Sequence, residues 1–167
     1  MTLEQIPSGN RVFIDAPVFI YHFTGASLEC KTFLERCAAA DLVALTSSVV
    51  MAEVLHRLLM IEAVAEGLVT PGNAVRKLRK RPELIRRLGR YQDQVESIPL
   101  MSISIQPVDS GTLLRSARVR SQYGLLVNDS LVATSAIDHD ATTLASNDRD
   151  FERVDELELF RPGDLAS

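Results

Sequence analysis

The sequence predicts a single α/β domain over residues 1–167, with its core at about 11–152. The expected architecture is a central parallel sheet of four to five strands with right-handed helical crossovers. Short apolar, β-branched runs alternate with longer amphipathic segments, which is the order of parallel strands joined by helical crossovers. The chain has 167 residues, of which 46% are apolar, enough for one well-packed core but not for two.

The first β-α-β unit is predicted from the N-terminal third of the chain. A strand is expected over residues 11–15, Arg-Val-Phe-Ile-Asp, and it ends in a carboxylate. Pro17 suits the first turn of a short helix over 18–23. An amphipathic helix over 27–40 then leads to the second strand, over 41–46.

The second strand leads into a long apolar helix that carries one acid. Hydroxyl residues at 46–48 are good helix N-caps, and the run that follows them predicts a helix that Gly67 ends. Glu53 lies in one of the first turns of this helix. A carboxylate there also favours the helix dipole, so a purely structural role for Glu53 alone stays open.

The helical pair expected at about residues 71–97, which Pro82 interrupts, carries most of the positive charge. Between Arg76 and Arg90 the net charge is +7, which leaves −11 for the rest of a chain whose total is −4. A basic segment on an acidic body fits RNA or an acidic partner protein, and both stay open. Its eight cations are Arg76, Lys77, Arg79, Lys80, Arg81, Arg86, Arg87 and Arg90.

A third strand and a further helix follow the basic segment. The strand is expected within residues 98–108, where Ile105 lies among alternating polar and apolar positions. The helix is expected over 111–123, with its arginines facing outward or towards a groove. The side chains expected to face inward are Leu113, Leu114, Ala117 and Val119.

The last elements again present acids where strands end or helices begin. Asp129 opens an apolar helix over 130–137, where a helix-capping role also stays open. A fourth strand is expected over 141–145, followed closely by Asp148, and an edge strand at 158–160.

Four acids therefore lie just after a strand or in the first turns of a helix. Because the carboxyl ends of parallel strands share one edge of a sheet, we expect these carboxylates to converge and to need a cation. Oxygen ligands without nearby Cys or His select a hard ion, Mg²⁺ or Mn²⁺. Such a site suits the hydrolysis of phosphodiesters. The four acids are Asp15, Glu53, Asp129 and Asp148.

The histidines and cysteines indicate no competing chemistry. His22, His56 and His139 lack a partner motif for nucleophilic catalysis, and we expect structural or surface roles for them. Cys30 and Cys37 show no C-x-x-C spacing, so we expect reduced core thiols in a cytoplasmic protein. No segment approaches the ~20 apolar residues that span a bilayer, and the first ten residues are too polar for a signal peptide.

Four short motifs in order resemble the PIN-domain family and, within it, the VapC-like toxins of bacterial and archaeal toxin–antitoxin systems. They run from about residue 11 to 152. Each motif is weak alone, and the four in sequence are specific. The motifs are Phe13-Ile-Asp15 with Phe19-Ile-Tyr21, Thr46-Ser-Ser-Val-Val-Met-Ala-Glu53-Val, Asn128-Asp129-Ser-Leu-Val-Ala-Thr-Ser-Ala, and Ser146-Asn-Asp148-Arg-Asp150-Phe.

The resemblance implies a three-layer α/β/α sandwich around the central parallel sheet of four to five strands. It also implies a Mg²⁺- or Mn²⁺-dependent endoribonuclease that acts as the toxin of a type II toxin–antitoxin module. By position, the four acids form the site, with Asp150 as an accessory carboxylate and Ser146 in the place of the family's usual hydroxyl. The family implies three partners: an RNA substrate, a second copy in a homodimer, and a cognate antitoxin that occupies the acidic groove.

Two departures from the family pattern keep an alternative open. Ala16-Pro17 follows the first acid where many members carry a hydroxyl and a polar residue, and Val50 replaces a frequent Thr. Lost hydroxyls weaken the ordering of a metal site. The alternative is a catalytically weakened PIN domain that binds RNA or protein. A phospho-acceptor domain fits less well, because Asp15 lacks an adjacent acid and no lysine follows Lys80.

Overall fold

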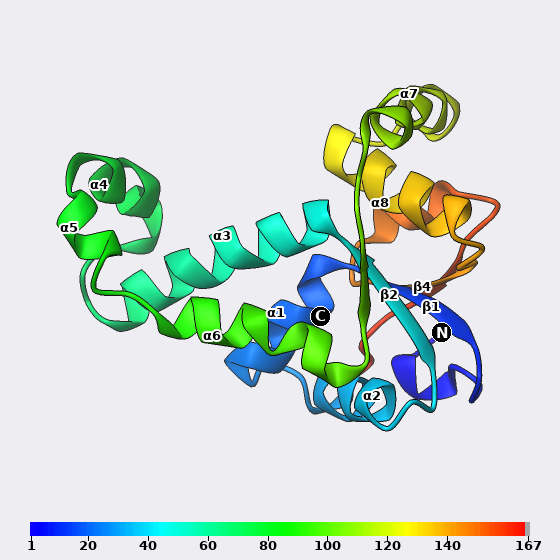
Figure 1. Ribbon diagram of the computed structural model, residues 1–167, viewed down its shortest axis with the longest axis horizontal. Helices are drawn as coiled ribbons and strands as arrows, with labels where there is room; N and C mark the ends of the chain where they lie inside the picture. The colour runs from blue at the N-terminus through cyan, green and yellow to red at the C-terminus, as the bar shows by residue number, and fades with distance from the viewer. Residues whose placement is uncertain (166–167) are drawn as a thin grey trace.

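One parallel sheet organises the protein. The computed structural model describes residues 1–165, and its sheet has five strands in the order β3-β2-β1-β4-β5 (Figure 1). All four strand pairs are parallel, which confirms the predicted fold class. The strands are β1 (Arg11–Ile14), β2 (Val43–Ser47), β3 (Ser104–Gln106), β4 (Thr143–Ala145) and β5 (Glu158–Phe160).

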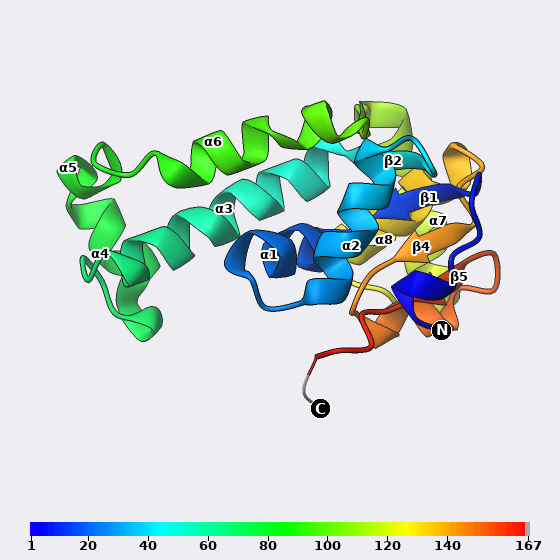
Figure 2. The same ribbon diagram turned by 90° about the horizontal axis from the view of Figure 1, so that it is seen from below.

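Helices cover both faces of this sheet. In two perpendicular views α1 and α2 lie on one face, and α8 lies on the other with α7 beyond it (Figures 1 and 2). The helices are η1 (Leu3–Gln5), α1 (Ala16–Thr24), α2 (Leu28–Ala38), α3 (Ser48–Ala65), η2 (Pro71–Asn73), α4 (Ala74–Lys80), α5 (Pro82–Ile85), α6 (Arg90–Glu96), η3 (Ile98–Met101), α7 (Ser110–Tyr123), α8 (Val127–Asp138) and η4 (Arg149–Arg153).

β1 lies in the middle of the sheet, and this position explains why its sequence is a continuous apolar run. Val12, Phe13 and Ile14 of β1 are all fully buried. A strand with helices on both faces buries both sides, so its residues do not alternate between apolar and polar. Cys30 and Cys37 are buried and unpaired, as predicted.

The strand order creates a crevice at the carboxyl edge of the sheet. β1 pairs with β2 on one side and with β4 on the other, so the winding direction reverses between β1 and β4. In open α/β sheets, ligands bind at such a switch point. Asp15 directly follows β1, and Asp148 lies shortly after β4, so both reach this crevice.

Two predicted elements in the middle of the chain are shorter than expected. The first four residues of the expected third strand form the 3₁₀ helix η3, with Pro99 in its first turn, and Ser102 ends it in a left-handed conformation at φ 58°. The second helix of the basic pair is divided into α5, which ends at Ile85, and α6, which begins at Arg90 after the non-helical N-cap residue Gly89.

The prediction for the inner face of α7 was wrong for Leu113, Leu114 and Ala117, which are exposed. It was confirmed for Val119, which packs against the main core. Leu113 and Leu114 are 50% and 76% exposed, whereas Thr112 and Ser116 are buried. α7 packs on α8, and Arg120 of α7 donates to the Ser130 hydroxyl of α8 at 3.1 Å, while Arg115 of α7 donates to Asp138 of α8 at 2.6 Å. Hydrogen bonds therefore join the two helices in addition to the apolar contacts that Val119 and Tyr123 make with the main core.

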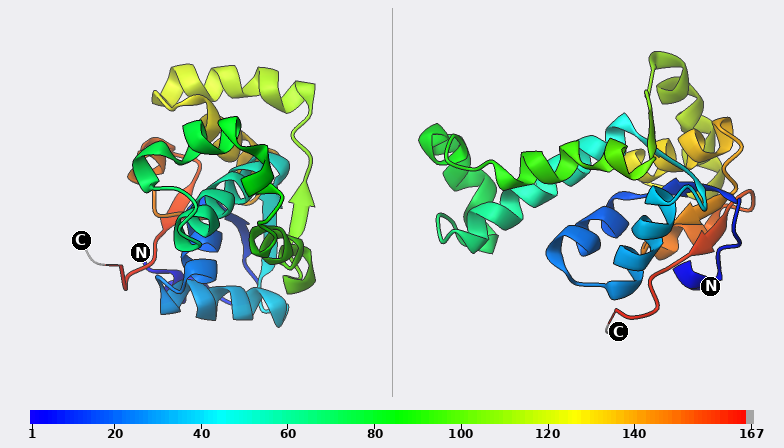
Figure 3. Two further views of the ribbon diagram at one scale, coloured as in Figure 1. Left: turned by 90° about the vertical axis from the view of Figure 1, so that its left-hand side faces the viewer. Right: turned by 60° about the horizontal axis from the view of Figure 1, so that its bottom comes forward.

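The segment between β2 and β3 extends away from the sheet. α3 and α6 run side by side, and α4 and α5 lie at their far end (Figures 1 and 3). This end has a small apolar cluster of its own, separate from the main core. Its buried members are Ala63, Val69, Ala74, Leu78 and Leu84. Within residues 1–165, no helix is both long and apolar enough to cross a bilayer.

Candidate metal centre

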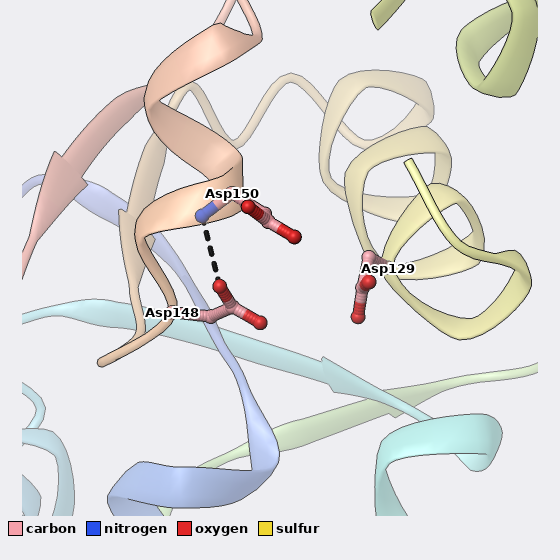
Figure 4. Close-up of side chains that lie close together, drawn as sticks. All are labelled: Asp129, Asp148 and Asp150. Atoms are coloured by element: carbon pink, nitrogen blue, oxygen red, sulfur yellow. Dashed lines mark hydrogen bonds between the residues drawn. The ribbon is translucent and has the colours of Figure 1, made fainter. Parts of the chain in front are cut away.

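Three carboxylates converge at the switch point of the sheet. One ligand oxygen from each of Asp129, Asp148 and Asp150 lies within 4.8 Å of the other two. Asp129 projects from the start of α8, while the other two acids belong to the turn into η4 (Figure 4). All three side chains are half-buried and therefore remain reachable from solvent.

Local hydrogen bonds shape the turn that carries two of these acids. Asp148 caps η4, and its Oδ1 accepts from the Asp150 backbone N–H at 2.8 Å. The backbone N–H of Asp148 donates in turn to the Ser146 hydroxyl at 3.1 Å. This short-range bonding is typical of Asp and Ser at helix starts, and it brings Asp150 beside Asp148.

Asp15 lies deeper, behind this turn, and is only 6% exposed. Its Oδ1 accepts from the Ala16 backbone N–H at 2.7 Å, and its Oδ2 accepts from the Ser146 hydroxyl at 2.6 Å. Ser146 therefore joins Asp15 to the Asp148 turn. The orienting hydroxyl comes from β4's end, so a Thr or Ser directly after Asp15 is not needed to hold its carboxylate.

Burial raises the pKa of Asp15 to about 7, against the lowering effect of its two hydrogen bonds, and the charges of Glu53 and Asp129 add to the rise. Burial also raises the pKa of Asp129, followed by the repulsion from Asp148, Asp150 and Glu53. Carboxylates that repel one another in this way share one electrostatic environment. A bound cation relieves that repulsion.

Glu53 lies at the border of the acidic group. It is half-buried in α3 and forms an ion pair with Arg57, one turn further on, at 3.7 Å. Glu53 also lines an open pocket of about 460 Å³ together with His56, Arg57 and Asn128. Glu53 contributes charge to the site from outside the three converging carboxylates.

The acids that lie closest together in the structure are not the same set as the four that the sequence predicted to form the site. Asp150, expected as an accessory, lies in the tight group and also pairs with Arg153 at 2.7 Å. Asp15 and Glu53 lie behind and beside that group. The catalytic and metal-binding roles of all five acids, and of Ser146, stay predictions.

A hydrogen-bonded bridge supports the same turn and was missed by sequence reasoning. Asn147 donates from its amide to the Tyr21 hydroxyl at 3.2 Å, and its amide oxygen accepts from Arg161 at 3.1 Å. Asn147 therefore connects α1 to the end of β5 between the two site residues Ser146 and Asp148. The sequence places Asn147 within the last of the four motifs. It does not indicate the two hydrogen-bond partners, because they lie near opposite ends of the chain.

The donor set of the acidic group fits a hard divalent cation. Among the residues that the structure describes, the group offers carboxylate oxygens only and contains no His or Cys. Mg²⁺ and Mn²⁺ prefer oxygen ligands, and Mg²⁺ is commonly bound by one or two carboxylates and several waters. Three half-buried carboxylates leave room for such waters and for a phosphate.

The predicted cationic residues gather at the far end of α3. We define the basic tip as residues 71–90, which comprise η2, α4, α5 and the connection to α6. Nearly all of its charged side chains are exposed. Within residues 1–165, only Arg81 of the eight cations forms an ion pair, with Glu83 at 2.8 Å.

The fold and the acidic group define a parallel α/β protein with a candidate metal centre at its switch point. The PIN domain model matches residues 12–157, and the chain belongs to this family. It is similar to Ribonuclease VapC2 of Methanocaldococcus jannaschii, with 28% identity over 152 residues that cover 90% of this chain and 93% of the relative.

Solved structures show the same fold at lower sequence identity. The VapBC2 complex of Rickettsia felis, bound to a fragment of its promoter DNA, matches with a TM-score of 0.59 and 20% identity over 90% of this chain and 97% of that chain. A toxin–antitoxin complex from Klebsiella pneumoniae matches with a TM-score of 0.55 and 19% identity over 88% of this chain and 95% of that chain.

Proposed function

We propose that the protein is a metal-dependent endoribonuclease that hydrolyses RNA phosphodiester bonds. The observation that carries this proposal is the convergence of Asp129, Asp148 and Asp150 at the switch point of a PIN fold. The similarity to Ribonuclease VapC2 supports RNA as the substrate. The same acidic site without turnover would make the protein an RNA- or protein-binding module.

The chain's own residues have distinct roles in this proposal. Asp129, Asp148 and Asp150 would hold Mg²⁺ or Mn²⁺, which supplies charge stabilisation for the phosphodiester and an activated water. Glu53 adds negative charge at the border of the site. Ser146 positions Asp15 through its hydroxyl. Asp15 holds a proton near neutral pH in the metal-free protein, since its pKa is about 7.

We further propose that the protein is the toxin of a two-component module. Support comes from the solved relatives, which are toxin–antitoxin complexes of the same fold. The partners in this proposal are a cognate antitoxin, which would cover the acidic site, and a second copy of the chain in a homodimer.

The test is cleavage of a mixed RNA pool by purified protein with Mg²⁺, with Mn²⁺ and with EDTA. We expect metal-dependent cleavage, and we expect Asp129→Asn to lower its rate by about 100-fold or more, because loss of one ligand charge weakens both metal binding and charge stabilisation.

The matched control is Asp140→Asn, an exposed acid just beyond α8. Asp140 has φ 53°, a conformation that Asn tolerates, so this control should keep full activity. Cleavage in EDTA, or equal rates for the two variants, would contradict the proposed metal centre. Stable RNA binding without any cleavage would support the binding-module alternative.

A further inference from the structure

We propose that the basic tip is a second RNA-binding site, which holds the phosphate backbone of the substrate at a distance from the acidic group. This inference rests on the proposed function, because the strand held by the tip is the strand that the acidic site cuts. It assigns a specific task to a segment that makes no contact with the three converging carboxylates.

The charge of the tip is available for a ligand. Seven of its eight cations form no ion pair within the part of the chain that the structure describes. Like charges held this close repel one another and cost stability. A polyanion offsets that repulsion and releases counterions on binding, which is the main source of affinity for nucleic-acid backbones.

The surface chemistry of the tip favours RNA over a protein partner. Protein–protein interfaces have an apolar, aromatic-rich centre, whereas nucleic-acid interfaces are polar and strongly positive. Within residues 71–90 the only exposed large apolar side chain is Val75, at 42%. No aromatic residue belongs to this segment, so bases have no stacking platform there. The tip is therefore suited to phosphates and not to particular bases.

One helix sets the distance between the tip and the acidic group. Glu53 lies near the start of α3, and the tip begins just after Ala65, where that helix ends (Figure 3). At 1.5 Å per residue, about 18 Å of helix separates the two residues. An RNA strand that reaches from one site to the other must therefore be longer than a dinucleotide.

The surface of α3 next to the acidic group is open in the direction of the tip. The pocket beside Glu53 is lined by His56 and Arg57, which are exposed on the following turn. On its other side the pocket reaches Asn128, the neighbour of Asp129. A strand leaving the carboxylates can follow this open side of α3, where the polar side chains of His56 and Arg57 are exposed.

The tip is held in place by its own packing and by one buried carboxylate. Glu62 of α3 is only 7% exposed and accepts from three backbone N–H groups, those of Gly89, Arg90 and Tyr91, at 2.8–3.2 Å. These bonds and the separate apolar cluster fix α4 and α5 relative to α3. The tip is therefore a preformed surface.

The experiment compares two RNA lengths, because single-stranded sites span about 4–16 nucleotides. Cleavage of a dinucleotide and of an RNA of about 16 nucleotides is measured for wild type and for Arg86→Glu/Arg87→Glu. We expect KM for the longer RNA to rise about tenfold with kcat unchanged, and the shorter RNA to be cleaved as in wild type, since it cannot reach the tip.

Binding of the longer RNA in EDTA is measured as a function of salt and needs no catalysis. The slope of log K against log[salt] should fall by about 1.4 in the double variant, because each lost phosphate contact contributes about 0.7. Arg11→Glu/Lys31→Glu is the matched control, with two exposed cations changed on β1 and α2. This control should keep the wild-type slope and KM.

The outcomes separate the two proposals. Unchanged RNA binding and KM in Arg86→Glu/Arg87→Glu would contradict the second site. An equal loss of cleavage for both RNA lengths would contradict it as well. If wild-type protein cuts neither RNA, the proposed function fails, while the salt slope in EDTA still decides whether the tip binds RNA. Circular dichroism melting of the variants establishes that the exposed substitutions leave the fold intact.

Discussion

At the residue scale, the site depends on how one buried carboxylate is oriented. Asp15 is held by a backbone N–H and by the Ser146 hydroxyl, which also accepts from the Asp148 backbone. One hydroxyl thus serves two acids that lie more than a hundred positions apart. Ala16-Pro17 offers no hydroxyl to Asp15, and the side-chain hydrogen bond to this carboxylate comes from Ser146 instead.

The raised pKa of Asp15 predicts a pH dependence of stability in the metal-free protein. Burial brings this pKa to about 7 from an ordinary value of 3.8. The folded state therefore holds a proton that the unfolded chain has lost. The stability that Asp15 contributes is complete below pH 3.8 and is lost as the pH rises towards 7.

The Asp15→Asn variant should not show this loss of stability with rising pH. Between pH 5 and pH 8, the variant should gain up to about 3 kcal/mol of unfolding free energy relative to wild type, at ~1.4 kcal/mol per pH unit up to the folded pKa. Urea unfolding in EDTA at the two pH values measures it, with Asp140→Asn as the exposed control. Parallel changes in Asp15→Asn and wild type would show that Asp15 titrates normally.

At the element scale, the same chain contains two differently stabilised parts. The sheet with α1, α2 and α8 is held by a large apolar core, which includes Phe13, Phe19 and Phe33. The basic tip has only a small cluster of its own and is fastened to α3 by Glu62. Segments with few buried apolar contacts open more readily than the core, so a single hydrogen-bonding residue matters more there.

Glu62→Gln is expected to loosen the tip without disturbing the sheet. Burial raises the pKa of Glu62, but its bonds from the Tyr91, Gly89 and Arg90 backbones outweigh burial and lower it. Its stabilisation is therefore present above the ordinary value of 4.5 and is lost as the pH falls. Hydrogen bonds to a charged group contribute about 1.5–3 kcal/mol, so we expect a loss of about 2 kcal/mol at neutral pH.

Amide hydrogen exchange measures where this loss occurs. Protection should fall at residues 89–91 and through α4, while β1 amides keep their protection. Glu66→Gln changes an exposed carboxylate at the end of the same helix and should leave the exchange pattern unaltered. A uniform loss of protection in Glu62→Gln would mean that the tip and the sheet unfold as one unit.

At the scale of the whole molecule, acidic and basic regions are separated along α3. The carboxylates converge at the switch point of the sheet, near the start of α3, whereas α4 and α5, which belong to the basic tip, lie at the other end of that helix (Figure 1). This separation keeps the cations from forming ion pairs with the site. In the proposed function, the basic tip would attract the RNA and the acidic group would cut it.

The toxin proposal predicts a growth phenotype. Induced expression in a bacterial host should arrest growth, and Asp129→Asn should relieve the arrest while Asp140→Asn does not, because only the first removes a carboxylate of the acidic group. Colony counts after induction, at matched protein levels, measure the effect. If Asp129→Asn arrested growth as strongly as wild type, catalysis at the acidic group would not be the cause of the toxicity.

Element types and their order could be predicted from local patterns. Apolar runs of β-branched residues predicted the strands, and the helix that carries Glu53 was predicted to within a few residues from its cap and its Gly67 stop. Local patterns failed at α7, where Leu113 and Leu114 face solvent. The spacing of apolar residues predicts which side chains share a helix face, but it does not predict which face packs against a neighbouring element.

The sequence by itself determined the fold class, the family and the set of acids that reach one edge of the sheet, because strand ends and helix starts are encoded locally. Only the tertiary structure decided that Asp129, Asp148 and Asp150 form the tight group, that Asp15 is buried behind it, and that Glu62 fastens the tip. These distances join residues far apart in the chain, and packing between elements sets them.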